Sequence, residues 1–164
     1  MEIRQKKTQP THQPRPDLAS SLIGIANAQW GQDNLTEAFE NAQKALEINE
    51  SIESENELNL AMNLAILAII HHRAGEDTKA LDYITRALAL LERCVEPDSL
   101  TLASILNNMG TIQVFLNMYK EAHLSFNRAL QICEKNLPEG HPKRVTMENN
   151  IQRIGQIIRA NQQS

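Results

Sequence analysis

The chain contains few of the residues that strand-rich folds, disulfide scaffolds and membrane spans require. Only 4% of its 164 residues are aromatic, and it has six glycines and six prolines, which favours helices over strands. Cys94 and Cys133 stand outside any CxxC motif, so no disulfide framework is indicated and both are expected to be buried free thiols. No apolar run reaches the roughly 20 residues of a bilayer span, and the N-terminus lacks the apolar segment of a secretory signal. A cytoplasmic, reduced protein is therefore expected.

The sequence also lacks the motifs of catalysis and of cofactor binding. It has no GxGxxG, GxxxxGKS/T, GxSxG or HExxH, so we expect neither an enzyme nor a bound cofactor. His71 and His72 do not predict a metal site, because neighbouring residues on a helix point about 100° apart and cannot share one ion. His71 falls instead on the packing row of its helix, where we expect a hydrogen-bonded core histidine.

Charge is unevenly distributed along the chain. Residues 1–16 carry four basic side chains and one acidic side chain, a net charge of +3, so the whole-chain value of −4 leaves −7 for residues 17–164. Nucleic-acid binding needs a basic stripe to neutralise phosphates, so an acidic body argues against a nucleic-acid partner. Residues 1–16 also hold three prolines and no helical pattern, which predicts a disordered arm or a linker.

What the sequence does have is a repeat with a period of 42 residues. Small residues recur where two helices would cross, and larger apolar residues recur beside them, as at Leu22, Leu64 and Leu106. Helices joined by a short turn approach closely only if the side chains at their crossing are small, so this pattern predicts helix hairpins. The small residues form three sets: Ala26, Ala68 and Gly110; Ala38, Ala80 and Ala122; Ala45, Ala87 and Ala129.

Apolar periodicity and turn residues predict the individual helices. The last helix has apolar residues at the 4, 3, 4 spacing of an amphipathic face and polar residues elsewhere, as expected of a helix that caps an array. The predicted helices cover about 17–31 and 35–52, 56–74 and 77–95, 98–117 and 119–137, and 142–161. They form a repeat domain over 17–162, with repeats of about 17–54, 55–96 and 97–138.

This pattern resembles the tetratricopeptide repeat, which reads W-x2-L-G-x2-Y, then A-x3-F, A and P. The third unit reads Leu106, Met109-Gly110, Ala122, Phe126 and Ala129. Two departures recur in every unit: the tyrosine position holds Gln29, His71 or Gln113, and the proline position holds Glu50, Glu92 or Glu134. Without that proline the second helix can continue, which accounts for a period of 42. The segment ALQICEKNLPEGHPKRVTMENN, which ends at Asn150, is similar to the long-period subclass found in kinesin light chains.

The resemblance implies an all-α, right-handed superhelical solenoid of three antiparallel helix hairpins with a C-terminal capping helix. In this family the first helices of the hairpins line a concave groove that binds a protein or peptide. We expect a groove with an apolar half and an amide-rich half. The apolar half comprises Trp30, Met62, Ile66 and Ile69, the amide-rich half comprises Asn107, Asn108, Asn149 and Asn150, and the remaining groove candidates are Asn27, Arg73, Thr111 and Arg153.

The two asparagine pairs are the main candidates for ligand contact. Asn107 and Asn149 are 42 residues apart, as are Asn108 and Asn150. An amide can both donate to and accept from a peptide backbone, and in the resembling family such asparagines grip peptide backbones. The alternative interpretation is that these amides merely face water.

Other ligands and functions were weighed against a peptide groove. The clamp that binds heat-shock chaperone tails in one tetratricopeptide subclass is rejected, because Ile23, Ile66 and Ser104 replace its polar or cationic residues. One alternative function is a structural scaffold that forms a weak homo-oligomer through the groove or an end face. Another is a sensor module of a larger regulator.

Overall fold

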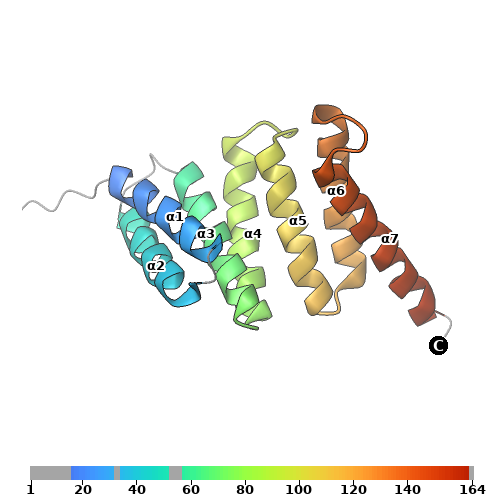
Figure 1. The fold of residues 1–164 in the computed structure, drawn as a ribbon, viewed down its shortest axis with the longest axis horizontal. Helices are drawn as coiled ribbons and strands as arrows, with labels where there is room; N and C mark the ends of the chain where they lie inside the picture. Colours follow the sequence, from blue (N-terminus) through green and yellow to red (C-terminus); the bar gives the residue numbers. More distant parts are fainter. Residues whose placement is uncertain (1–15, 32–33, 52–56, 163–164) are drawn as a thin grey trace, which may run out of the picture.

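The computed structural model describes residues 16–31, 34–51 and 57–162, and this part of the chain forms seven α-helices and no strand (Figure 1). Each helix matches a predicted one, and no bound differs by more than two residues. The arm expected at the N-terminus lies outside the described residues except for Pro16, the first residue of α1. The helices are α1 (Pro16–Gly31), α2 (Leu35–Ser51), α3 (Glu57–Arg73), α4 (Asp77–Cys94), α5 (Leu100–Phe115), α6 (Tyr119–Asn136) and α7 (Pro142–Gln162).

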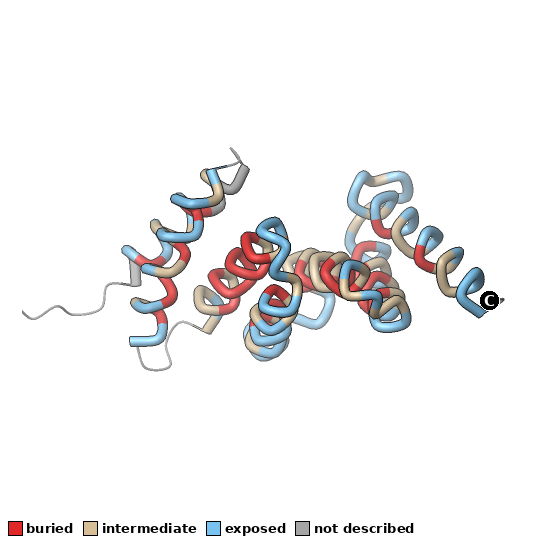
Figure 2. The backbone as a smooth tube through the Cα atoms, turned by 90° about the horizontal axis from the view of Figure 1, so that it is seen from below, coloured by how far each residue is buried: buried red, intermediate tan, exposed pale blue. Residues whose placement is uncertain are grey.

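The helices pair as three hairpins, α1–α2, α3–α4 and α5–α6, which stack along the molecule with α7 at the far end (Figure 1). The most extensive contacts lie within each hairpin, and smaller ones join α2 to α3, α4 to α5 and α6 to α7. Buried positions lie on the sides of the helices that face one another, while the outward sides are exposed (Figure 2). The fold is therefore an all-α solenoid of three hairpins with a final capping helix.

Helix α3 is the central element of the hydrophobic core. Nine of its 17 residues are buried, which explains why its sequence is apolar almost all round. Neither α3 nor any other helix of the described ranges has the combination of length and hydrophobicity that crossing a bilayer requires.

The helices of each hairpin cross at the small residues of the repeat, which are fully buried or nearly so. In the third hairpin a Cβ placed on Gly110 would lie 2.8 Å from the Phe126 ring, so this glycine makes room for the ring. The residues in register are Ala68 and Ile84 in the second hairpin, and Ala26 and Ala42 in the first, all with no exposed surface. The smallest first-helix residue, Gly110, thus faces the largest second-helix residue, Phe126, which keeps the volume of that crossing within the range that close packing allows.

The turns between the paired helices repeat the same hydrogen bond. In each hairpin an N–H after the turn donates to the carbonyl five residues earlier, at the position where the family has tyrosine. Gly75 and Asn117 occupy the same turn position in successive repeats and adopt φ angles of 78° and 60°, which glycine and asparagine tolerate best. The three bonds are Asn34 to Gln29 (3.0 Å), Glu76 to His71 (2.9 Å) and Met118 to Gln113 (2.8 Å).

Side chains at the tyrosine position also connect the two helices of each hairpin, always to the residue 12 positions later. His71 is 7% exposed and its ring stacks on Tyr83 with centroids 5.1 Å apart, so the predicted core histidine is confirmed. Its Nδ1 lies 2.5 Å from the Glu76 carboxylate, which can only accept, so Nδ1 carries the hydrogen. The equivalent bonds join Asn41 Nδ2 to Gln29 Oε1 (2.8 Å) and Ser125 Oγ to Gln113 Oε1 (2.8 Å).

Ion pairs link successive hairpins through the glutamates that replace the family's proline. Arg86 lies 3.5 Å from Glu50, and Arg128, one period later, lies 2.5 Å from Glu92. These side chains are 39% to 52% exposed, so each pair contributes at most about 1 kcal/mol of stability. The same pair recurs between α2 and α4 and between α4 and α6, so it marks equivalent contacts between successive hairpins.

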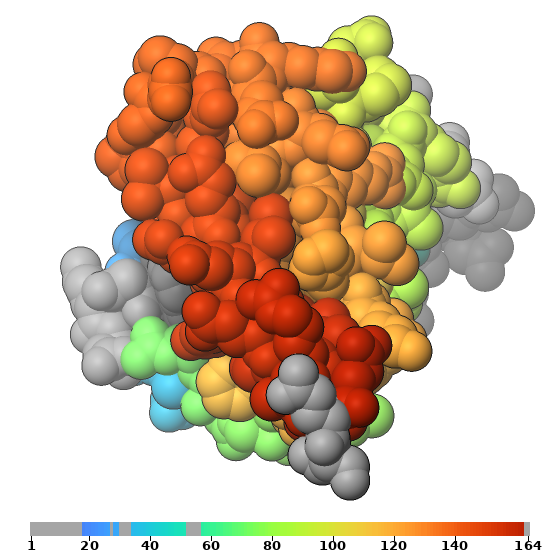
Figure 3. Space-filling view, turned by 90° about the vertical axis from the view of Figure 1, so that its right-hand side faces the viewer, coloured from blue at the N-terminus to red at the C-terminus, as the bar shows by residue number. Residues whose placement is uncertain are grey.

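Helix α7 lies across the end of the molecule beside α6 (Figure 3). Met147 and Ile154 are its buried contacts. His141 caps its start, since Nδ1 accepts from the Lys143 N–H at 3.2 Å. Gln152 stands in register with Gly110 and is exposed, so a further helix could not approach α7 as closely as α6 approaches α5. A polar residue at this crossing position suits a capping helix.

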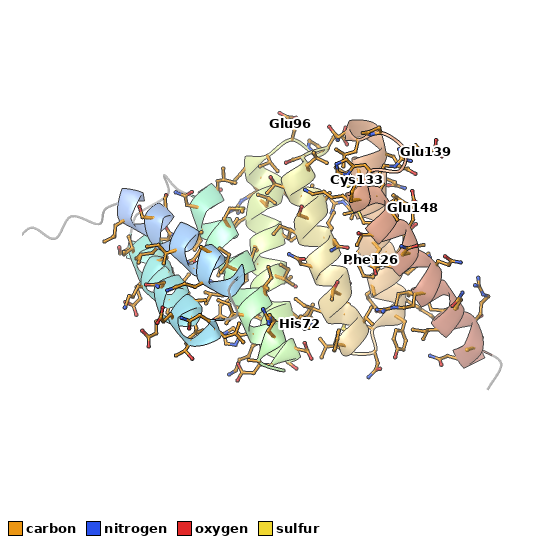
Figure 4. All side chains as sticks on the ribbon, viewed as in Figure 1. His72, Glu96, Phe126, Cys133, Glu139 and Glu148 are labelled. Carbon is orange, nitrogen blue, oxygen red and sulfur yellow. The ribbon has the colours of Figure 1, made fainter. Side chains whose placement is uncertain are left out.

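The two cysteines differ, which corrects one prediction. Cys133, labelled in Figure 4, lies on α6 and is buried as expected, but Cys94 is exposed at the end of α4. The repeat explains the difference, because Cys133 is in register with buried Leu91, whereas Cys94 is in register with exposed Asn136. Desolvation raises the pKa of both thiols, and the Glu57 carboxylate, 3.7 Å from Cys94 Sγ, raises that of Cys94 further.

Candidate functional site: a groove across the first helices

Three adjoining hollows lie on the side of the solenoid formed by the first helices. Their lining residues come from α1, α3, α5 and α7, and none comes from the second helices α2, α4 and α6. The hollows share residues, so they form one groove that crosses the stack.

The first hollow is mainly apolar and has a volume of about 370 Å³. Helix α3 contributes half-buried Met62 and Ile69 and also Ile66, which is 8% exposed. Such a hollow can take one large apolar side chain. Its other lining residues are Ile23, Gly24, Ala65, Leu100, Thr101, Ser104, Ile105, Asn108 and Lys143.

The second hollow lies between α3 and α5 and also measures about 370 Å³. His72 lines it (Figure 4), and its ring is held on both sides. Nδ1 lies 2.5 Å from Asp77 Oδ1, and the ring meets Phe115 edge-on with centroids 4.7 Å apart. The carboxylate fixes the hydrogen on Nδ1, which makes Nε2 an acceptor in the neutral ring. The remaining lining residues are Ile69, Arg73, Asn108, Thr111 and Ile112.

The third hollow is smaller, about 190 Å³, and more polar. It lies between α5 and α7 and is lined by Ser104, Asn107, Asn108, Lys143, Thr146 and Met147. Asn150 of α7 stands next to it, because its Nδ2 donates to Asn107 Oδ1 at 3.3 Å. This bond crosses from α5 to α7 and leaves the Asn107 amide hydrogens free to donate.

Asn108 is the residue that the three hollows share. Its side chain is half-buried, and it has no side-chain hydrogen bond within the described residues. A partly desolvated amide without a protein partner is suited to receive one from a ligand. The groove therefore combines apolar anchoring surface with an available amide at its centre.

The structure brings together most of the predicted groove residues. Asn149 and Arg153 are exposed on α7 and do not line the three hollows, because Asn150 is the residue of that turn that meets α5. Asn27 and Trp30 lie on α1, but their side chains are outside the described part of the structure. The predicted residues that line the groove are Met62, Ile66, Ile69, Arg73, Asn107, Asn108 and Thr111.

Sequence reasoning missed several lining residues that the 42-residue register indicates. Met62, Ser104 and Thr146 are in register, and all three line the groove, although only Met62 was a candidate. Lys143 is in register with Thr101 and lines two hollows, so it brings a cation to the groove. The sequence does not show which side of α3 faces the groove. Once that side is known, the 42-residue register identifies the groove-facing residues of the other first helices.

The described residues contain no cluster of three side chains that could serve as metal ligands. His71 and His72 each pair with a different carboxylate, five residues further along the chain, because the turn after α3 folds Glu76 and Asp77 back onto the helix end. The Lys79 ammonium, 2.9 Å away, and the His71 imidazole hold the pKa of Glu76 below its usual value.

Several solved structures share this fold. A kinesin light chain with nearly identical TPR-like repeats from Podosopora anserina has a TM-score of 0.77 at 15% identity, covering 87% of this chain and 68% of that one. BtubC (BKLC) from P. vanneervenii has a TM-score of 0.75 at 24% identity, covering 89% and 59%. The first TPR of Spaghetti (RPAP3), solved with the HSP90 peptide SRMEEVD, has a TM-score of 0.66 at 16% identity, covering 88% and 95%.

Among curated proteins, a clustered mitochondria protein homolog from Coccidioides immitis (strain RS) is 23% identical over 120 residues. The match covers 73% of this chain but only 9% of that protein, so the chain spans less than a tenth of its relative's length.

The family itself is shown by sequence. The model of the Tetratricopeptide repeat family matches residues 17–93 and 60–135, which together make up more than half of the chain. The solved structures, including the one with kinesin-light-chain repeats, agree in fold. The chain therefore belongs to the tetratricopeptide repeat family, with repeats like those of kinesin light chains.

Proposed function

We propose that this chain is a protein-interaction module that binds an extended peptide segment of a partner protein in the groove across its first helices. The observation that carries the proposal is the continuity of the three hollows, which meet at Asn108. The Spaghetti (RPAP3) domain, a fold neighbour, was solved with a peptide bound, which supports a peptide as the class of ligand.

The ligand's backbone and side chains would use different parts of the groove. The amides of Asn107, Asn108 and Asn150 can pair with backbone N–H and C=O groups of a peptide whatever its sequence. The apolar hollow beside Met62 and Ile69 would take a large apolar side chain and provide most of the selectivity. Asn149 and Arg153 would contact only a ligand long enough to reach the exposed part of α7.

Peptides selected from a random-sequence library on the purified chain provide the test. Their affinities would be measured by fluorescence anisotropy for wild-type protein and for Asn108→Ala. We expect Asn108→Ala to weaken binding about 2- to 10-fold, the effect of losing one or two hydrogen bonds to a ligand. The control is Asn161→Ala, an exposed amide near the end of α7 that does not line the groove.

A double variant tests the pair of asparagines that the sequence predicts as ligand contacts. Asn107→Ala combined with Asn149→Ala removes both amides of that register. An affinity equal to wild type, with the helical circular dichroism spectrum intact, would overturn the backbone contact. Equal affinities for Asn108→Ala and wild type would overturn the groove as the binding surface.

We infer further that chaperone tails such as SRMEEVD are not the natural ligands. Ile23, Ile66 and Ser104 hold the clamp positions, and the cations Lys143 and Arg73 line different hollows, so they do not form a ring around a terminal carboxylate. Titration of that peptide should give no saturable binding at concentrations where the selected peptides saturate. Comparable affinity would show that Lys143 and Arg73 together replace the clamp.

A further inference from the structure

The outer side of α1 carries an apolar stripe that has no helix packed on it among the described residues. Leu18 is 48% exposed and Ile25 is 47% exposed, although each keeps the residue type of an internal repeat. In register with Leu18, Leu60 is half-buried and Leu102 is 1% exposed, and in register with Ile25, Leu67 is fully buried and Met109 is half-buried. Helices α3 and α5 have a preceding hairpin packed on them, whereas α1 is the first helix that the structure describes (Figures 1 and 2).

Large and small residues alternate along this stripe. Leu18, Ser21, Ile25 and Ala28 follow one another at spacings of three, four and three, so they lie on one face of the helix, and all four are exposed. This is the spacing of the two seam positions of a heptad. The stripe therefore has the form of a helix–helix contact surface.

The order of sizes fits a second copy of the same helix running antiparallel. If the two-fold axis passes at residue 23, Leu18 of one copy faces Ala28 of the other, because both lie five residues from the axis. In the same way Ile25 faces Ser21, each two residues from the axis. Every large side chain would meet a small one, which is the self-complementarity that an isologous interface requires.

Charge permits the same arrangement. From Leu18 to Gly31, α1 contains no aspartate, glutamate, lysine or arginine. Two copies can therefore bring these faces together without like-charge repulsion and without burying an unpaired charge.

We propose that the chain forms a symmetric homodimer through antiparallel packing of α1 against α1 of a second copy. The contact uses the outer side of α1, whereas the peptide groove uses Ile23 on the opposite side of the helix, and Gly24 lies between the two surfaces. A dimer would accordingly present two grooves, and dimerisation and peptide binding can be tested separately.

Sedimentation equilibrium over a wide concentration series tests the proposal. Wild-type protein should show a monomer–dimer equilibrium, and Ile25→Glu should weaken it about tenfold or more, because the charge would be buried without a partner. Leu124→Glu is the matched control, since Leu124 is 69% exposed on α6, away from α1, and the change should leave the equilibrium as it is. A wild-type monomer at every concentration would overturn the proposal in favour of a different helix on this face.

A size swap tests the pairing itself. Ser21→Ile alone should dissociate the dimer, because two large residues would then face each other. Adding Ile25→Ser should restore it, because each large side chain again meets a small one. Circular dichroism would show that both variants keep their helices. A folded double variant that stays as monomeric as Ser21→Ile would overturn the antiparallel register.

Discussion

Replacing Gly110 with alanine should strain the third hairpin through a single contact. The added Cβ would lie 2.8 Å from Cε1 of Phe126 and 2.9 Å from Cδ1 and Cζ, well inside van der Waals contact. The ring cannot easily move, because Phe126 is only 2% exposed. Overpacking of this kind costs about 1–3 kcal/mol, while alanine gains about 1 kcal/mol over glycine within a helix. The net loss in the free energy of unfolding is therefore about 0–2 kcal/mol.

A double-mutant cycle separates these two effects. Phe126→Ile removes the ring and gives the third hairpin the Ala/Ile pair that Ala68 and Ile84 form by register in the second. In that background Gly110→Ala should stabilise the chain by about 1 kcal/mol, because only the helix preference remains. The coupling between the two changes is then about 1–3 kcal/mol and favourable.

Urea denaturation followed by circular dichroism at 222 nm, a standard helix signal, measures all four proteins of the cycle. Gly24→Ala is the control for helix preference, since no atom lies within 4 Å of the Cβ it would add. It should raise stability by up to about 1 kcal/mol with no clash. Additive effects at Gly110 and Phe126, within about 0.5 kcal/mol, would refute the packing explanation of the small residues.

Three further predictions concern turn geometry, a buried amide and a titrating carboxyl. Gly75→Ala should lower the free energy of unfolding, measured by urea denaturation, by about 1–2 kcal/mol, because alanine disfavours the φ of 78° at this position. Gly75→Asn should lower it less, since Asn117 adopts a φ of 60° at the same turn position. Equal losses for the two variants would exclude backbone strain as the cause. Asn63 has no exposed surface, and neither polar atom of its side-chain amide has a hydrogen-bond partner among the described residues. Replacing it with isoleucine, the residue that stands in register at position 105, should therefore raise the free energy of unfolding by about 1–3 kcal/mol. A lower free energy of unfolding for Asn63→Ile would show that the amide has a partner. Because Lys79 and His71 lower the pKa of Glu76, that carboxylate stabilises the fold above its ordinary pKa and the contribution disappears as the pH falls through the lowered value. The difference in melting temperature between wild type and Glu76→Gln should therefore be largest near neutral pH and vanish in acid, and a difference that does not change with pH would contradict the pairing.

The helices and their hairpin pairing could be predicted from the sequence because the small residues mark each crossing. A glycine or alanine repeated at a fixed interval has few explanations other than close packing, so Ala68, Ala80 and their counterparts set the fold. Turn positions followed from the same interval. The buried state of His71 was also accessible, because its place on the packing row depends on helix geometry alone.

The groove was predicted less completely, because its lining depends on how the helices tilt and on how the turns fold, which the sequence pattern does not specify. Asn149 and Asn150 are neighbours on α7, and the tilt of that helix against α6 decides which one meets Asn107. Cys94 was expected to be buried because of its residue type, but it lies three residues beyond buried Leu91 and in register with exposed Asn136, so its place in the repeat decides its exposure. His71 and His72 pair with carboxylates five residues later in the sequence, across the turn after α3. Helical periodicity indicates only partners three or four residues away, so it does not predict these pairs.

The peptide groove is tested most directly by amide chemical-shift mapping with a peptide selected on the full chain. If the first helices form the binding surface, the shifts should concentrate on the facing residues of α3 and α5, including Ile69, Ser104 and Asn108, with α7 affected near Lys143. The outer residues of α4 and α6, such as Arg86 and Arg128, should stay unchanged. Shifts centred on those second helices, with Asn108 unaffected, would contradict a groove on the first helices.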